Sequence, residues 1–269
     1  MPPKRKAHKR VDAVDLTDDA SPEKKQKVAL TTIAKEFICP ITHELPIKPV
    51  MAEDGKIYEE KAIREWWSQK DGDPTSPSTG AVIGTKLFPA PQARNTIEAL
   101  VKSGAIAGEI AEAWKEKLED EKAVEEIRAK ADGGDGDAMY RLGVWYQYGK
   151  NGLAEDYVQA RAWFVRSAAA RDPRGIATFG EYLLLGLGGS KETSFGLVNV
   201  TEAAGLGSDF AAYLLGKAFF HGMYNLPKDP VRARYWLRKV ADGGCEYKHL
   251  NDAGKADAAR WLRELEQEE

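Results

Sequence analysis

Apolar residues follow two different periods along this chain of 269 residues. In the first third, short apolar pairs flank Asp54-Gly55, a dipeptide that tolerates the positive φ needed by a two-residue hairpin turn. From 59 to 69 the period becomes helical, with apolar side chains on one face. These side chains are Ala62, Ile63, Trp66 and Trp67. The pattern predicts a small sheet packed on an amphipathic helix.

Two irregular loops flank these elements, one from 39 to 48 and one from 72 to 80, where prolines and glycines exclude regular structure. Cys39 and His43 are the only Cys and His residues between 37 and 101, too few for two four-ligand zinc sites. Packing and hydrogen bonds must therefore hold the loops. The polar candidates, which the sequence does not pair, are Glu44, Asp54, Lys56, Glu59 and Arg94.

From about residue 131 the chain repeats itself every 36 or 37 residues. The recurring positions are Gly143, Gly180 and Gly216, then Gly149, Gly186 and Gly222, then Ala168, Ala204 and Ala241. Each of three units predicts a helix hairpin, in which small residues let backbones approach and aromatics fill the remaining space. The middle unit is degenerate in its second helix. A closing helix is predicted over 253–265, with Trp261 on its apolar face.

Residues 109–131 are rich in Ala, Glu and Lys, with Ile110, Trp114, Leu118 and Ile127 at mostly helical spacing. This predicts a connecting helix. It would act as a semi-rigid spacer or pack on either neighbouring region. A dimerising coiled coil is a further alternative, although the segment holds few heptads.

Residues 1–32 are polar and aperiodic, which predicts a disordered tail. Two basic clusters there predict a bipartite nuclear import signal, with a merely solvated or phosphate-contacting tail as the alternative. The clusters are Lys4, Arg5, Lys6, Lys9 and Arg10, then Lys24, Lys25 and Lys27. Between them, Val14, Asp15, Leu16 and Thr17 are similar to SUMO-interacting motifs, in which a short apolar strand adds to a sheet edge.

Composition narrows the class of protein. No run of eighteen apolar residues and no secretory segment occurs, so neither export nor membrane spanning is expected. Cys39 and Cys245 are too few for a disulfide framework and favour a reducing compartment. The tail to residue 30 carries +3 and the remainder −6, which argues against specific nucleic-acid binding.

Recognisable cofactor chemistry is missing from the sequence. No Gly-rich phosphate loop, paired carboxylates or metal-ligand cluster is present, so no cofactor and no metal are expected. Cys39 with His43 could suggest a thiol nucleophile, but no third group that would orient the histidine is identifiable.

Residues 37–101 resemble the U-box, the zinc-free relative of the RING domain found in ubiquitin ligases. The resemblance rests on Cys39-Pro40-Ile41-Thr42, Pro49-Val50, Gly55-Lys56-Ile57-Tyr58-Glu59, Ile63 with Trp66, Ser76-Pro77, and Arg94 with Ile97. Through Leu142-Gly143-Val144-Trp145-Tyr146, the repeats resemble the Sel-one-like repeat, a relative of the tetratricopeptide repeat. The expected fold is an α+β zinc-free RING-like U-box followed by an all-α helical-repeat solenoid. The expected divisions are a tail (1–32), a U-box (33–103), a connecting helix (104–131), three repeats (132–250) and a capping helix (251–269).

The U-box resemblance implies a surface that binds a ubiquitin-conjugating enzyme charged with ubiquitin. It would comprise Ile41, His43, Trp66 and Pro77, with Pro74 as the alternative to Pro77. Catalysis would be non-covalent, because such a ligase orients the thioester and supplies no nucleophile. Two residues depart from the family, His43 where relatives carry Leu or Phe, and Gly80 near a position that is often basic or amide.

The expected function is that of a ubiquitin-protein ligase in the nucleus, or in the nucleus and cytoplasm, whose repeats recruit a protein substrate or a chaperone-like partner on their concave surface. One alternative, motivated by His43 and Gly80, is a non-enzymatic nuclear scaffold with a degenerate U-box. Another is an oligomeric adaptor, such as a homodimer held by the long helix.

Overall fold

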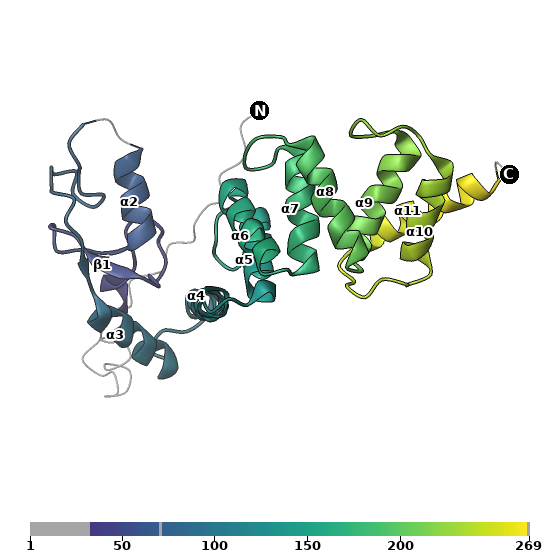
Figure 1. Cartoon of the computed structure of the whole chain (residues 1–269). Coiled ribbons are helices and arrows are strands. Elements are labelled where there is room, and N and C mark those ends of the chain that lie inside the picture. Colours follow the sequence, from purple (N-terminus) through teal and green to yellow (C-terminus); the bar gives the residue numbers. More distant parts are fainter. Residues whose placement is uncertain (1–32, 70–71, 268–269) are drawn as a thin grey trace, which may run out of the picture. The chain divides into compact units, whose positions relative to one another are not determined.

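The computed structural model describes residues 33–69 and 72–267. Its contacts divide the chain into two compact units, Met1–Leu118 and Glu119–Glu269, and each is described by itself. Figure 1 shows a small sheet with helices in the first unit and paired helices in the second. Within the described ranges, every helix is too short or too polar to span a lipid bilayer.

The first unit is built around a three-stranded antiparallel sheet with the strand order β2-β1-β3. Its strands are β1 (Pro49–Met51), β2 (Ile57–Glu59) and β3 (Phe88–Pro89). The predicted hairpin is confirmed, with Val50 opposite Tyr58. The predicted two-residue turn is wrong, because the Ala52 N–H donates to the Lys56 carbonyl at 3.1 Å and three residues lie between them. Gly55 ends that turn with φ 73°, as three-residue hairpin loops commonly do.

Helix α2 (Glu60–Ser68) follows β2 directly and closes one core of the first unit. Its Ile63 is fully buried, and Trp67 packs half-buried on the same core. The predicted apolar helix face is therefore confirmed. The buried residues of this core are Cys39, Val50, Ala52, Tyr58 and Ile63.

A second core joins helix α3 (Pro91–Lys102) to the start of helix α4 (Glu109–Asp132). Trp114 is buried between them, and its Nε1–H donates to the Pro46 carbonyl at 3.1 Å. The first half of α4 is thus part of the first unit. The main buried residues of this core are Leu45, Ile47, Ile97, Leu100, Val101, Ile106, Trp114 and Leu118.

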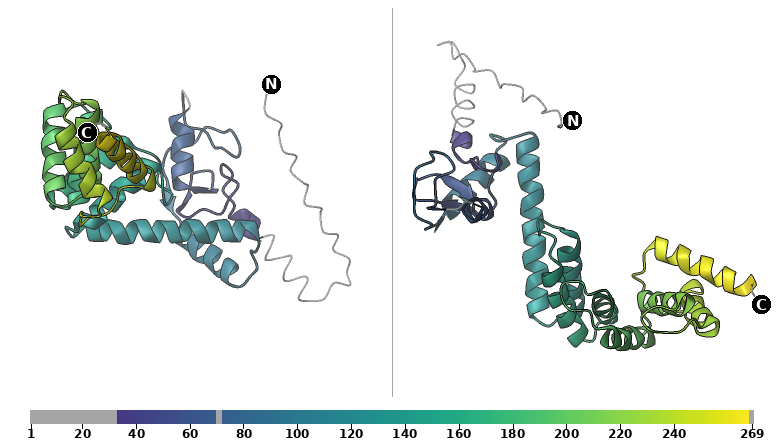
Figure 2. Two further views of the ribbon diagram at one scale, coloured as in Figure 1. Left: turned by 90° about the vertical axis from the view of Figure 1, so that its right-hand side faces the viewer. Right: turned by 90° about the horizontal axis from the view of Figure 1, so that it is seen from above.

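The second unit is a row of helix pairs. The pairs are α5 (Gly136–Tyr148) with α6 (Tyr157–Ala169), α7 (Pro173–Leu185) with α8 (Thr193–Gly205), and α9 (Asp209–His221) with α10 (Pro230–Ala241). Figure 2 shows these pairs following one another, with α11 (Asp252–Gln267) after them. Helix α11 packs on α9 and α10, and its Trp261 is buried. The predicted solenoid is therefore confirmed.

The glycine periods have two physical causes. A Cβ on Gly143 would lie 2.4 Å from the ring of the buried Phe164, so only glycine lets α5 and α6 approach this closely. Gly149 ends α5 in the left-handed conformation, with φ 59°. The equivalent positions in the next two pairs behave alike. They are Gly180 and Gly216 for the close approach, and Gly186 and Gly222 for the helix end.

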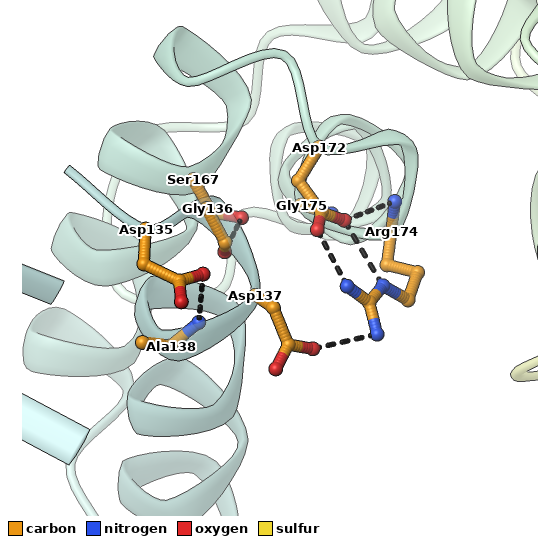
Figure 3. Close-up of polar contacts among 8 residues, drawn as sticks. All are labelled: Asp135, Gly136, Asp137, Ala138, Ser167, Asp172, Arg174 and Gly175. Carbon is orange, nitrogen blue, oxygen red and sulfur yellow. Dashed lines mark hydrogen bonds and ion pairs between the residues drawn. The ribbon is translucent and has the colours of Figure 1, made fainter. Parts of the chain in front are cut away.

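Polar residues begin the first helix of each pair at the same spacing. Asp135, Asp172 and Ser208 each accept a hydrogen bond from a backbone N–H in the first turn of α5, α7 and α9. Figure 3 shows how two of these caps lie at the junction of the first two pairs. There Arg174 bonds both carboxylate oxygens of Asp172 and pairs with Asp137 at 2.7 Å. Within the first pair, the Ser167 hydroxyl of α6 donates to the Gly136 carbonyl of α5 at 2.8 Å.

Candidate functional site

The predicted site residues of the first unit lie on three elements. Ile41 and His43 lie on the first loop (39–48), Trp66 on α2, and Pro77 on the second loop (72–84). His43 is exposed, and the other three side chains are half-buried. Ile41 packs against the core of Cys39, Tyr58 and Ile63, which also receives side chains from α2 and the second loop. The three elements therefore share one core.

The backbone conformation of His43 gives a physical reason for its identity. Its φ is 59°, in the left-handed region, where histidine occurs more often than most residues with a Cβ. Its N–H donates to the Cys39 carbonyl at 2.8 Å, so a tight turn fixes this conformation. A leucine here would bear backbone strain of about 1–2 kcal/mol.

The carboxylate of Glu59 holds the first loop to the hairpin. Its Oε2 accepts the backbone N–H of Ile47 at 2.7 Å and of Lys48 at 3.1 Å. The Cys39 N–H closes the start of the loop on the Glu44 carbonyl at 2.9 Å, and Glu44 forms an ion pair with Lys117 of α4. The loop is thus fixed at its beginning, middle and end.

The carboxylate of Asp54 holds the second loop in the same way. Its Oδ2 accepts the hydroxyl of Ser76 at 2.6 Å and that of Tyr58 at 2.7 Å. Ser76 is buried, and its Oγ also accepts the N–H groups of Ser78 and Thr79 at 3.2 and 3.0 Å. One carboxylate and one hydroxyl therefore organise the loop that carries Pro77.

The environment of Asp54 favours its charged form. Burial opposes ionisation, but hydrogen bonds from the Ser76 hydroxyl, the Lys56 N–H and the Tyr58 hydroxyl outweigh it, so the pKa of Asp54 lies below its usual 3.8. Burial is also the largest cause of the raised pKa of Tyr58, which stays protonated as a donor. The network is therefore in its bonded charge state at neutral pH.

Cys39 is a core residue in this structure. It has no exposed surface, and its Sγ accepts the Glu59 N–H at 3.3 Å, whereas His43 is exposed. A thiol in this position cannot reach a substrate. In the described part of the chain, no group of three or more His, Cys, Asp or Glu could hold a metal ion.

The remaining predicted site residues lie outside the described residues. They are Lys4, Arg5, Lys6, Lys9, Arg10, Lys24, Lys25 and Lys27 of the basic clusters, and Val14, Asp15, Leu16 and Thr17 of the SUMO-interacting pattern.

Sequence reasoning named Asp54 and Glu59 but not their partners, and it overlooked the role of Ser76. It placed Trp114 at an apolar position of the connecting helix without naming its partner, and it assigned no role to Lys117; both residues tie α4 to the first loop. A lone Trp in a helix rich in Ala, Glu and Lys was the available signal for that contact.

The fold defines a zinc-free α+β module followed by a helical-repeat solenoid. Residues 33–105 match the family model of the U-box domain, and residues 136–172 and 209–245 match that of the Sel1 repeat. The chain therefore carries a U-box domain followed by Sel1 repeats. The middle helix pair, α7 and α8, lies largely between the two matched repeats.

Similar proteins cover parts of the chain. The human WD repeat, SAM and U-box domain-containing protein 1 is 48% identical over 64 residues, 24% of this chain and 13% of the relative. A protein of Acanthamoeba polyphaga mimivirus named "Probable bifunctional E2/E3 enzyme R795" is 43% identical over 53 residues, 20% of this chain and 4% of the relative. A crystal structure of a Sel1 repeat protein from Oxalobacter formigenes has 28% identity and a TM-score of 0.41, covering 45% of this chain and 90% of its own. The matched region thus spans only a small part of these two curated relatives.

Proposed function

We propose that this protein is a ubiquitin-protein ligase of the U-box type. The observation that carries the proposal is the pair of carboxylates, Glu59 and Asp54, that fixes two irregular loops around one core without metal ligands. Similar proteins that are named as E2/E3 or E3 enzymes support the same role in general terms.

The ligase would act by binding and orientation. Ile41, His43, Trp66 and Pro77 would contact a ubiquitin-conjugating enzyme, whose thioester-linked ubiquitin is then attacked by a substrate lysine. Restricting the freedom of the thioester can supply several kcal/mol of the barrier, so the ligase needs no nucleophile of its own. The thiol of Cys39 is buried, which fits a ligase that uses no nucleophile of its own.

The Sel1 repeats would recruit the substrate or a protein partner. The first helices of the pairs, α5, α7 and α9, line a cavity together with α11, and a surface of this kind suits an extended segment of another protein. We further propose that the basic clusters between Lys4 and Lys27 direct the protein to the nucleus, which a fluorescent fusion with both clusters changed to alanine would test.

An in vitro assay tests the ligase. Purified full chain, ubiquitin-activating enzyme and a panel of conjugating enzymes should give autoubiquitination, which Ile41→Ala should reduce about tenfold or more. Because Ile41 also packs on the core, its thermal unfolding must be compared with that of the original chain. The exposed Val231→Ala in α10 is the matched control and should keep full activity.

The rival function is a scaffold that transfers no ubiquitin, favoured by the absence of a side chain at Gly80. If the folded protein showed no autoubiquitination with any conjugating enzyme, the result would favour the scaffold. In that case His43→Leu is the first repair to test, because residue 43 already carries a Cβ at φ 59°, whereas Gly80→Arg would introduce one at φ 74°.

A further inference from the structure

The second unit contains a cavity of about 470 Å³ between α5, α7, α9, α11 and the segment before α11. Aromatic side chains form much of its wall. They are Tyr140 and Tyr148 from α5, and Phe210 and Tyr213 from α9. Three charged side chains line the same space, Glu181 from α7, Lys217 from α9 and Asp257 from α11.

Glu181 differs from the other acidic residues near this cavity. Asp257 of α11 pairs with Arg260 at 2.7 Å, and the buried Asp209 accepts the N–H groups of His249 and Leu250 at 2.9 and 3.0 Å. Among the described residues, Glu181 has neither a hydrogen bond nor an ion pair. Glu181 is half-buried, and no described residue lies close enough to form an ion pair with it.

An unpaired carboxylate in such a place costs free energy, because burial removes the water that would stabilise its charge. The pKa of Glu181 is accordingly raised to about 7, mainly by burial, with a smaller opposing effect of Lys217. A cation that entered the cavity would recover this cost. The charge of Glu181 therefore favours the binding of a cation in this cavity.

The aromatic residues of the cavity wall also favour a bound cation, which is called the guest below. The faces of aromatic rings attract cations. Lys217 already places its ammonium 5.9 Å from the centre of the Tyr213 ring, so a cation over an aromatic ring fits this wall. Lys217 lies on the helix that follows α7 in the row of first helices, and it acts on Glu181 only through its charge, without an ion pair.

We propose that this cavity binds the lysine or arginine side chain of an extended segment of another protein, with Glu181 as its counter-ion and the tyrosines as its wall. The proposal deepens the proposed function, since it rests on the repeats being the partner-binding part of the molecule. Lys217 would compete with the guest for Glu181 and would turn towards solvent when the guest binds.

Binding should be linked to ionisation of Glu181. The guest favours the charged carboxylate, so its affinity rises with pH through about 7. Lys217, Asp257, His249 and four aromatic residues, three of them tyrosines, also line the cavity. Burial lowers the pKa of His249 and raises that of Tyr140 to about 12, so neither of these changes charge in this range.

Four matched peptide pools test the proposal. Each pool has random flanks around one fixed central residue, which is arginine, lysine, citrulline or norleucine, and each is bound to the immobilised full chain. The arginine and lysine pools should be retained about tenfold more than the citrulline and norleucine pools, because only their side chains bring a positive charge to Glu181. The Glu181→Gln variant should no longer retain the arginine and lysine pools more than the other two pools.

Two further variants sharpen the result. Glu202→Gln removes the same charge from the exposed face of α8 and should keep the preference, while Lys217→Ala removes the competitor and should strengthen retention severalfold. Equal retention of arginine and citrulline pools, no retention of any pool, or an unchanged preference in Glu181→Gln would each overturn the proposal. Autoubiquitination by Glu181→Gln should stay unchanged, so a failed ligase assay and a failed peptide test are distinguishable.

Discussion

The carboxylates that fix the U-box loops and those that cap the repeat helices act at different ranges along the chain. In the U-box, Asp54 bonds Ser76 across 22 residues, and Glu59 reaches back 11 and 12 residues to the first loop. In the repeats, Asp135 and Asp172 cap amides two or three residues ahead. Irregular loops need bonds from elsewhere in the fold, whereas helices need them only at their own ends.

The units also differ in how their apolar residues are organised. The U-box divides its apolar side chains between two small cores, while the repeats place an equivalent glycine and apolar contact at every pair. A damaged contact in the U-box should therefore disturb a loop, and one in the repeats should disturb neighbouring pairs.

The largest effect is expected inside the repeats. Phe164→Ala removes a fully buried ring that packs on Gly143 and on Tyr182, and should lower the free energy of unfolding by about 3–5 kcal/mol. Hydrogen exchange should accelerate in α5, α6 and α7. The neighbouring Val165→Ala, at a 41% exposed position, should cost no more than about 0.5 kcal/mol. Equal losses in both variants would contradict the packing described for this pair.

A smaller effect is expected from removing the carboxylate of Asp54, which holds the second loop through hydrogen bonds. Asp54→Ala leaves the hydroxyls of Ser76 and Tyr58 without their acceptor and should destabilise the U-box by about 1–3 kcal/mol in urea unfolding. Amides 76–79 should exchange faster. Asp73→Ala, an exposed aspartate in the same loop, is the control and should behave as the original chain.

The contribution of Asp54 should also depend on pH. Its pKa is lowered in the folded state, so its stabilisation is complete above the ordinary value of 3.8 and is lost as pH falls through the lower folded pKa. The stability difference between the original chain and Asp54→Ala should therefore shrink only in this acidic range. A difference that disappears near neutral pH would implicate another group.

A still smaller effect should follow from separating α4 from the first loop. Trp114→Phe keeps an aromatic ring but removes the hydrogen bond to the Pro46 carbonyl, at a cost of about 1 kcal/mol. Hydrogen exchange in residues 39–48 should report the loss. Lys115→Ala, on the exposed side of the same helix, is the control and should leave the exchange of these amides unchanged. Equal exchange in both variants would contradict a stabilising contact between Trp114 and the first loop.

The smallest effect should be a gain. Asp156 and Asp229 cap α6 and α10, but Glu192 stands at the equivalent position of α8 and forms no cap. Glu192→Asp should supply the cap and stabilise the repeats by about 0.5–1 kcal/mol in urea unfolding. Asp156→Glu is the reciprocal variant and should destabilise by a similar amount. If both substitutions act in the same direction, the caps do not explain the difference between the pairs.

Much of the fold followed from local signals. The hairpin position, the apolar face of α2 and the repeat period were all visible because each depends on residues a few positions apart. The turn length was mispredicted at Asp54-Gly55, since the Asp54 side chain bonds Ser76 and the Lys56 N–H in a wider turn. The candidate site followed from a resemblance, and the sequence alone did not supply the bonds that shape it.

The sequence by itself determined the order of the two domains, the helix pairs and the residues that begin and end them, because caps, small residues and apolar periods act over one or two helical turns. Only the tertiary structure decided that Asp54 meets Ser76, that Trp114 packs against the first loop, and that Glu181 faces an aromatic cavity without an ion pair to a described residue. Such pairings join residues far apart in the chain. Their energies depend on burial, which no local pattern specifies.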